Sequence, residues 1–166
     1  MLFVLTGSSA AGKSAVLPGL RSRVRALAVY DFDELGVPSD ADETWRRRGN
    51  ERWVRRALEH QAHGTDTLVA GRSPPAEWRA APSAPRLDGI AACLIDVADD
   101  MRIARLAQRR ARHGWPPEAL VGELLAWAAW HREHADDALV LDTTHATVAE
   151  TCDAIAAWIA GLRAAA

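Results

Sequence analysis

Gly7-Ser8-Ser9-Ala10-Ala11-Gly12-Lys13-Ser14 is a complete G-x-x-x-x-G-K-[ST] phosphate-binding loop. The apolar run Leu2-Phe3-Val4-Leu5 before it predicts a buried parallel strand, and the apolar spacing after Ser14 predicts a helix. This order lets successive backbone N–H groups and the positive end of a helix dipole face one phosphate chain. The stretch therefore predicts an α/β fold that binds a nucleotide through residues 7–14.

Lys13 is the only lysine of the chain, because every other basic residue among the twenty is an arginine. A composition that uses arginine elsewhere keeps lysine where a compact ammonium on a flexible stem is needed. In this motif the lysine reaches the β- and γ-phosphates, and the hydroxyl of Ser14 holds Mg²⁺. We therefore expect ATP and Mg²⁺ as cofactors and a catalytic role for Lys13.

Length and composition favour one domain that spans residues 1–166. The net charge of −2 predicts no general attraction to nucleic acid or to a membrane. No apolar run approaches the roughly 18 residues of a membrane span, and no basic-then-apolar leader precedes the first strand, so we expect a cytoplasmic protein. Cys93 and Cys152 lack metal-type spacing and are expected to be buried thiols.

Apolar runs alternate with helical segments along the rest of the chain. Further strands are predicted at residues 27–30, 67–70, 90–95 and 139–141, and helices at about 42–61, 99–112, 118–134 and after a capping box at Thr147 and Glu150. The proline-containing residues 72–88 are predicted to be mostly loop. Five apolar strands separated by helices indicate a parallel sheet covered on both faces, a three-layer α/β/α P-loop NTPase fold. Ligands bind such sheets at the carboxyl ends of the strands.

Asp31 and Asp33 follow the second strand. Their spacing of two places both carboxylates on the same side of an extended chain. Beside a magnesium-bound triphosphate, Asp31 is expected to support the metal through water, and Asp33 to accept the proton of an acceptor hydroxyl. The alternative is a cap or turn residue, because aspartate commonly ends strands.

Arg105, Arg109 and Arg112 recur at spacings of four and three, so they share one face of the helix predicted at 99–112. This helix ends at His113-Gly114-Trp115-Pro116-Pro117. A stripe of arginines before such a break favours a lid, approximately residues 105–117, that folds over the phosphates. Arg109 and Arg112 are predicted to neutralise charge on the transferred group; the alternative is a solvated basic face.

Most of the chain resembles small P-loop kinases. The phosphate loop, Asp31-Phe32-Asp33-Glu34 and the glycine at the end of the third strand resemble shikimate kinase, whose D-x-D serves the metal and the acceptor. The stripe from Arg105 to Arg112 and Asp142-Thr143-Thr144-His145 resemble the chloramphenicol phosphotransferase family, where these stretches form the lid and the nucleotide-base side. The resemblance implies that Arg105 and Thr143 contact the nucleotide. The third strand departs from both patterns, since it ends in Gly71-Arg72 with neither an acidic residue nor a triple glycine.

Arginines also supply the candidates for binding the acceptor. Arg72 is placed to hold an anionic group of the acceptor, with a surface salt bridge as the alternative. The helix at 42–61 carries six arginines, and the shikimate kinase resemblance places Arg55 or Arg56 nearest the acceptor's carboxylate. Two alternatives remain for this helix: its arginines form a charged outer face, or its basic and aromatic residues bind a nucleotide or the end of a single-stranded nucleic acid. Trp127 and Trp130 are interpreted as core or helix-packing residues.

These patterns predict a phosphotransferase that moves the γ-phosphate of ATP to a hydroxyl of a small molecule, such as an antibiotic or another metabolite. Two alternatives stay open: a nucleotide or polynucleotide kinase, and a P-loop NTPase that hydrolyses ATP to drive partner binding. The third strand lacks a terminal Asp-Glu pair to position water and metal, which disfavours the hydrolase. Asp96, after the fourth strand, is a substitute that such a hydrolase would need, but the fold is expected to place it farther from the loop.

Overall fold

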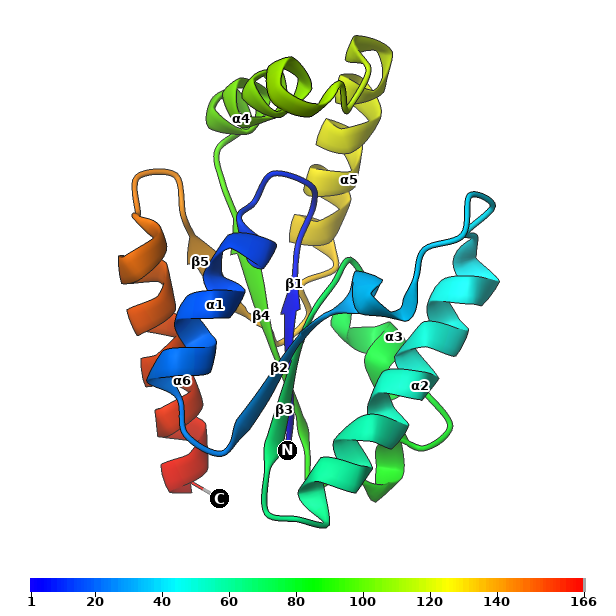
Figure 1. Ribbon diagram of the computed structural model, residues 1–166, viewed down its shortest axis with the longest axis vertical. Coiled ribbons are helices and arrows are strands. Elements are labelled where there is room, and N and C mark those ends of the chain that lie inside the picture. The colour runs from blue at the N-terminus through cyan, green and yellow to red at the C-terminus, as the bar shows by residue number, and fades with distance from the viewer. Residues whose placement is uncertain (166) are drawn as a thin grey trace.

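A five-stranded parallel sheet forms the centre of the computed structural model, which describes residues 1–165 (Figure 1). The strands are β1 (Leu2–Thr6), β2 (Leu27–Asp31), β3 (Asp66–Ala70), β4 (Ile90–Asp96) and β5 (Leu139–Asp142). Their order is β2-β3-β1-β4-β5, so the strand that leads into the phosphate loop lies in the middle. Leu5 of β1 pairs with Ala70 on one side and Cys93 on the other. The predicted parallel sheet is confirmed.

Helices cover both faces of the sheet. Helices α1 (Lys13–Arg23) and α6 (Val148–Ala165) pack on one face, and α2 (Glu43–Gln61) and α3 (Pro75–Arg79) on the other (Figure 1). Side chains of β1 alternate between two buried clusters, because successive residues of a strand point to opposite faces. Phe3 and Leu5 join the cluster under α1 and α6, whereas Leu2 and Val4 join the cluster under α2 and α3. The layers are those predicted from the sequence.

Helix α6 begins at the predicted capping box. Glu150 N donates to Thr147 Oγ1 at 3.2 Å, and Thr147 N donates to Glu150 Oε2 at 2.8 Å. Residues 72–88 were predicted to be mostly loop, but they contain more regular structure, namely α3 and a short 3₁₀ helix at Ala84–Arg86. Pro75 opens α3 at a position where a missing N–H costs nothing, so this proline starts a helix rather than a loop.

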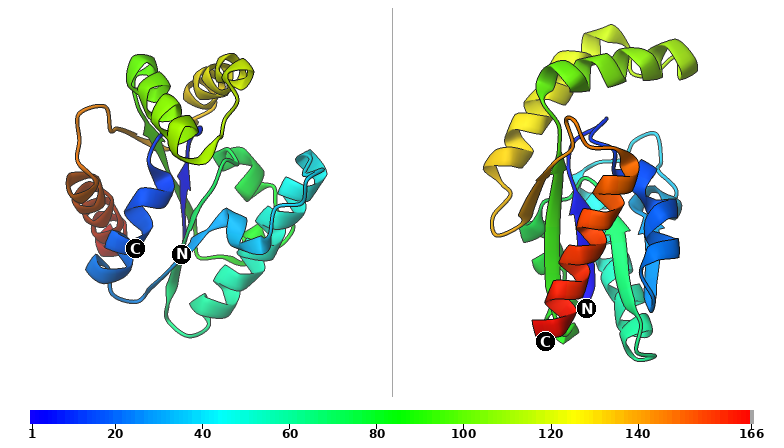
Figure 2. Two further views of the ribbon diagram at one scale, coloured as in Figure 1. Left: turned by 45° about the horizontal axis from the view of Figure 1, so that its top comes forward. Right: turned by 90° about the vertical axis from the view of Figure 1, so that its left-hand side faces the viewer.

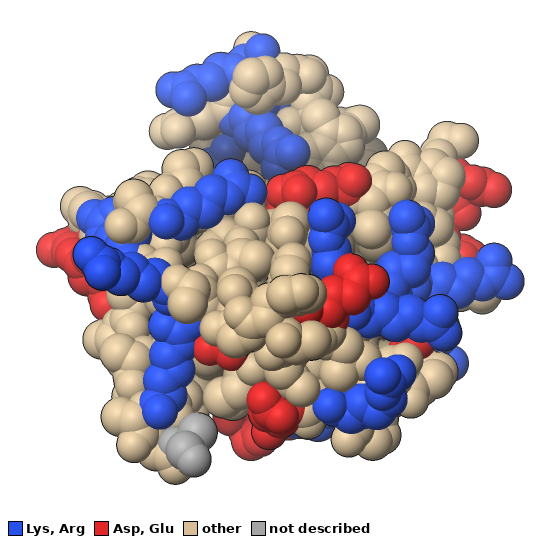
Figure 3. All heavy atoms as spheres, turned by 60° about the horizontal axis from the view of Figure 1, so that its bottom comes forward, with Lys and Arg blue, Asp and Glu red and all other residues tan. Residues whose placement is uncertain are grey.

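Two helices lie above the carboxyl ends of the strands. Helix α4 (Asp99–His113) extends across this end, and α5 (Val121–Glu133) descends from it after a 3₁₀ turn at Glu118–Leu120 (Figures 1 and 2). Helix α4 ends at Gly114, whose φ of 70° is left-handed. On the face shown in Figure 3, which turns the opposite end of the molecule toward the viewer, basic and acidic side chains are interspersed. None of the helices within residues 1–165 has the length and apolar character needed to cross a membrane.

Candidate active site

A cavity of about 910 Å³ lies at the carboxyl ends of the strands. Its walls come from the phosphate loop, the ends of β2 and β3, the start of α2, helices α4 and α5, and the segment between β5 and α6. The structure brings most of the predicted site residues to this cavity: Ser9, Ala10, Ala11, Gly12, Lys13, Ser14, Asp31, Asp33, Arg72, Arg105, Arg109 and Thr143. Gly7 and Ser8 begin the same loop but do not line the cavity in the described part of the chain.

The phosphate loop needs glycine at two positions. Gly7 has a φ of 144°, and a Cβ there would lie 2.4 Å from the carbonyl oxygen of Ile95. Gly12, just before α1, has a φ of 108°. Ala10 also adopts a positive φ, 63°, which costs energy for a residue with a side chain. Backbone angles of this kind turn N–H groups toward a common anion and are typical of phosphate sites.

Lys13 points back onto its own loop. Its Nζ donates to the carbonyl oxygens of Gly7 at 2.6 Å and Ser8 at 3.0 Å. Burial, and next the charge of Arg72, lower the pKa of Lys13 from 10.5 to about 8. Burial and then Lys13 lower the pKa of neighbouring His131 to about 4, so this imidazole is neutral at pH 7. The charge of Lys13 is thus destabilised by burial and by nearby arginines, and an incoming anion would stabilise it.

Ser14 and Asp31 supply two oxygen ligands suited to a small hard cation. The Ser14 hydroxyl donates to Asp31 Oδ2 at 2.6 Å, and Asp31 Oδ1 accepts from the backbone N of Asp33 at 3.1 Å. Asp31 therefore caps the 3₁₀ helix Phe32–Leu35, the role given as the alternative, and also reaches the phosphate loop. Residues 1–165 contain no cluster of three acidic, histidine or cysteine ligands. Magnesium typically takes one or two protein oxygens and completes its shell with phosphates and water, so the pair fits Mg²⁺.

Asp33 stands in the cavity as a less acidic carboxyl. Partial burial, and then the adjacent negative charge of Asp31, raise the pKa of Asp33 above its ordinary 3.8. Lys13 and Arg72 act in the opposite direction, so both lie within electrostatic range of this carboxyl. The raised pKa makes Asp33 a stronger base than an ordinary aspartate, which suits it to accept a proton.

Arg72 follows the end of β3 by two residues and lines the cavity. Its guanidinium lies over the ring of Trp127, 5.3 Å from the ring centroid. Within residues 1–165 it forms no ion pair and donates no hydrogen bond to another residue, so its donors are free. Desolvation and then Arg46 lower the pKa of Arg72, while Asp33 and Glu123 oppose that shift. An unpaired guanidinium held on a flat ring is suited to binding an anionic group.

Two acceptor-side assignments from the sequence need correction. Arg55 does not line the cavity in the described part of the chain; it pairs with Glu51 at 2.6 Å beside a separate surface hollow. Arg46 lines the cavity instead and forms a bidentate pair with Glu77. Arg46 lies in the first turn of α2, near the site, whereas Arg55 lies nine residues, or about 14 Å, further along the helix. Trp127, interpreted as a packing residue, lines the cavity as well.

The predicted lid arginines have three different settings. Arg105 is anchored, since it donates to the carbonyl oxygens of Ala10 at 3.3 Å and Thr143 at 3.0 Å. Arg109 lines the cavity and its guanidinium lies 4.5 Å from the ring centroid of Trp115. Arg112, one turn later, is exposed and is not among the cavity-lining residues of the described chain. Of the three predicted lid arginines, Arg105 and Arg109 therefore line the cavity of the described chain and Arg112 does not.

Comparisons with known proteins show the fold. No family model matches the chain, and no curated protein matches its sequence. It is similar to the structure of a sugar kinase from Janibacter sp. HTCC2649, with a TM-score of 0.71 and 16% identity over 95% of this chain and 93% of that one. A gluconokinase from Sinorhizobium meliloti 1021 has a TM-score of 0.68 and 19% identity over 96% and 91% of the two chains. Shikimate kinase from Aquifex aeolicus has a TM-score of 0.61 and 16% identity over both entire chains. The predicted likeness to small kinases is confirmed for the fold.

Proposed function

We propose that this protein transfers the γ-phosphate of ATP to a hydroxyl group of a small molecule. The observation that carries the proposal is the convergence of three groups on one cavity of about 910 Å³: the phosphate loop, the Ser14–Asp31 oxygen pair and the less acidic Asp33. Each group matches one requirement of phosphoryl transfer, namely phosphate binding, a metal site and a proton acceptor.

The nucleotide side is formed by the loop and its surroundings. The N–H groups of residues 9–14 would bind the β-phosphate, and Lys13 would leave the carbonyls of Gly7 and Ser8 to reach the β- and γ-phosphates. Ser14 and Asp31 would hold Mg²⁺, which neutralises charge on the phosphates. Arg105 and Thr143 would form the wall beside the nucleotide, because both line the cavity where α4 meets the segment after β5.

Asp33 would act as the general base. It takes the proton of the acceptor hydroxyl, the acceptor oxygen forms a bond to the γ-phosphorus, and the bond from that phosphorus to the bridging oxygen breaks to leave ADP. Arg109 would stabilise the charge of the transferred group from helix α4, and Arg72 would do so as well or bind an anionic group of the acceptor. Arg112 would act only after a movement that brings it to the cavity.

The far wall of the cavity favours transfer over hydrolysis. Besides the phosphate loop, the cavity is lined by two arginines and two tryptophans, Arg46, Arg72, Trp45 and Trp127. A hydrolase, whose acceptor is water, would not need these side chains. The similar structures described as a sugar kinase, a gluconokinase and shikimate kinase support a small-molecule acceptor. The net charge of −2 gives no general attraction to nucleic acid.

A screen with γ-labelled ATP tests the proposal. Sugars, sugar acids, other hydroxylated metabolites, antibiotics, nucleosides and short oligonucleotides are incubated with enzyme, Mg²⁺ and label, and the labelled products are separated. The proposal expects label on at least one small hydroxyl compound, and none with Lys13→Ala. Label on oligonucleotides alone would support a polynucleotide kinase, and label found only as inorganic phosphate would support a hydrolase.

A further inference from the structure

Five consecutive carbonyl groups of the phosphate loop, those of residues 7–11, accept hydrogen bonds from side chains. Lys13 covers the first two, and Arg105 covers the last two, with Thr143 also donating to Ala11 at 3.1 Å. The middle carbonyl, of Ser9, accepts from Arg102 Nη1 at 2.7 Å. Lys13 would leave its carbonyls when a nucleotide binds, so the contacts from α4 and Thr143 are the ones that can persist.

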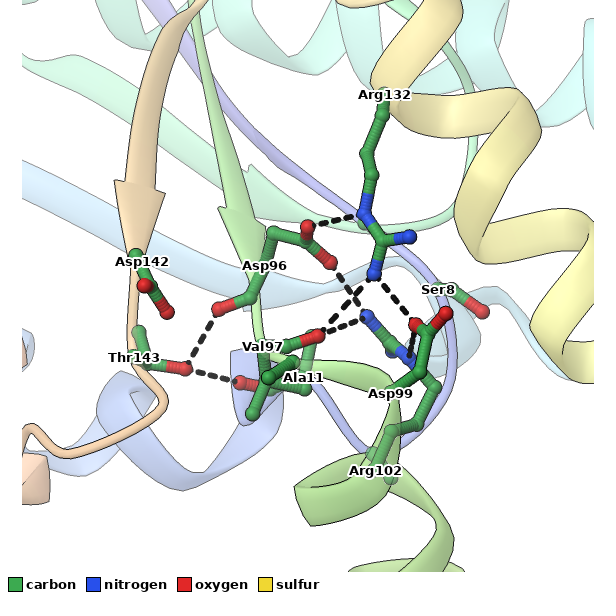
Figure 4. Close-up of polar contacts among 12 residues, drawn as sticks. Ser8, Ala11, Asp96, Val97, Asp99, Arg102, Arg132, Asp142 and Thr143 are labelled. Atoms are coloured by element: carbon green, nitrogen blue, oxygen red, sulfur yellow. Dashed lines mark hydrogen bonds and ion pairs between the residues drawn. The ribbon is translucent and has the colours of Figure 1, made fainter.

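Arg102 reaches the loop from the first turns of α4. Its side chain is 0% exposed, although it carries a charge. Besides the Ser9 contact, its Nη2 donates to Asp96 Oδ1 at 2.5 Å and to the carbonyl oxygen of Val97 at 3.2 Å (Figure 4). One guanidinium thus links the phosphate loop to the end of β4.

Arg132 of α5 binds the second oxygen of the Asp96 carboxylate. Its Nε donates to Asp96 Oδ2 at 2.5 Å, and its Nη2 donates to Asp99 Oδ1 at 2.6 Å (Figure 4). Asp96 therefore holds one arginine from α4 and one from α5. Two arginines face two aspartates, so the group is balanced in charge and adds little net field at the phosphates.

Stability alone does not explain why an arginine occupies this position. Within residues 1–165 the Nε of Arg102 has no hydrogen-bond acceptor, and the Asp99 carboxylate is 4.0 Å from it. A buried cation with an unsatisfied N–H is costly, and apolar side chains of similar volume often replace such ion pairs without loss of stability. The contact with Ser9 supplies a functional reason for the charge.

We propose that Arg102 is a positioning residue of the phosphate loop, held in place by Asp96 and Arg132. The C=O of Ser9 and the N–H of Ala10 belong to one planar trans peptide and point in opposite directions. By fixing that carbonyl, Arg102 keeps the Ala10 N–H directed to the other side, where a phosphate binds. The inference rests on the proposed nucleotide site and adds a residue that never touches the nucleotide.

Calorimetric titration with Mg·ADP tests the inference, since it needs neither an acceptor nor turnover. Arg102→Lys keeps the charge but loses the planar fork that holds Ser9 and Asp96 together. We expect the Kd of Arg102→Lys and Arg102→Leu to rise about tenfold or more, the usual effect of losing a charge-assisted hydrogen bond. Arg132→Gln, whose side chain is 35% exposed, should raise the Kd by a smaller factor. Arg110→Gln is the control, because Arg110 shares α4 but pairs with the exposed Glu118.

The number of binding sites separates positioning from folding. Loss of positioning raises the Kd at an unchanged number of sites, whereas partial misfolding lowers the number of sites at an unchanged Kd. The second pattern, or wild-type affinity in Arg102→Lys, overturns the inference. If neither Arg102 variant folds, Arg132→Gln decides, and wild-type affinity there overturns it. If the wild-type protein itself binds neither Mg·ADP nor Mg·ATP, the proposed function fails instead.

Discussion

The Ser14 hydroxyl donates a hydrogen bond of 2.6 Å to Asp31 Oδ2, although β3 lies in the sheet between β1, which leads to Ser14, and β2, which ends at Asp31. The contact joins the last residue of the phosphate loop to the D-x-D stretch that begins at the end of β2. It brings two hard oxygen atoms to one point beside the loop, which is where the metal of a nucleotide complex would lie.

Asp31→Asn should therefore change the magnesium dependence of the reaction. An amide oxygen is a weaker ligand than a carboxylate and carries no charge, so we expect the Mg²⁺ concentration for half-maximal rate to increase severalfold at fixed ATP. Glu34→Gln is the control, because Glu34 shares the cap of the 3₁₀ helix through the backbone N of Asp31 but does not reach Ser14. An equal change in both variants would assign Asp31 to the cap alone.

Asp33→Asn should separate chemistry from nucleotide binding. If Asp33 accepts the acceptor's proton, the variant should lose transfer by a factor of about 10² to 10⁴, the usual contribution of a general base, while Mg·ATP binds as before. Glu43→Gln removes another carboxylate of the same cavity and should keep most of the activity. Full transfer by Asp33→Asn to an identified acceptor would remove Asp33 from the mechanism.

The pH profile should show the raised pKa of Asp33. The base must be deprotonated, so kcat/KM should fall as the pH drops through a value above the ordinary 3.8 of aspartate. Because Asp31 contributes to the shift, Asp31→Asn should lower the pKa of Asp33 and move the acid limb to lower pH. An acid limb that stays in place, or moves to higher pH, would contradict this coupling.

The fold could be predicted from the sequence because its signals are local. Short apolar runs such as Leu2–Leu5 mark buried strands, the glycines of the loop mark backbone angles, and Thr147 with Glu150 marks a helix start. Helix α3 was missed because the prolines of this stretch indicate loop, while a proline in the first turn of a helix satisfies the same pattern.

Only part of the acceptor side could be predicted in the same way. Arg72 was a candidate because it follows a strand, whereas Arg46 and Trp127 come from α2 and α5, and only the packing of these helices brings them to the same cavity. The six arginines of α2 are alike in sequence, and the direction in which the helix leaves the site decides which of them is close. The burial of Arg102 could not be predicted from the sequence either, because several arginines along one helix are typical of a solvated helix face.

Substitution of Lys13 should abolish transfer in two chemically different ways. Lys13→Ala removes the charge that stabilises the phosphates, and loss of one such donor costs a factor of about 10² to 10³ or more. Lys13→Arg keeps a charge, but the planar guanidinium is bulkier than an ammonium and directs its donors differently, so it should not replace Lys13 at the β- and γ-phosphates. Steady-state rates of folded protein test both variants, and near-normal turnover of Lys13→Arg would refute the argument from the single lysine.

The lid arginines should differ in importance. Arg109 lines the cavity and should lower kcat by about 10² when replaced by alanine, with a smaller effect on ATP affinity. Arg112→Ala should have a smaller effect than Arg109→Ala, because Arg112 lies outside the cavity in the described chain and would reach it only after a movement of the lid. Hydrogen exchange over residues 105–117 should slow with Mg²⁺ and a nonhydrolysable ATP analogue. Unchanged exchange together with a normal Arg109→Ala enzyme would leave charge stabilisation to Arg72.

The fate of the γ-phosphate tests the central claim most directly. Once an acceptor is found, phosphorus NMR and mass spectrometry of the products show whether the phosphate is bound to a carbon-linked oxygen of the acceptor or is free in solution. The account predicts one phosphate ester formed for each ADP released, and no ester with Lys13→Ala or Asp33→Asn. Release of inorganic phosphate at the same rate with and without every acceptor tested would contradict it.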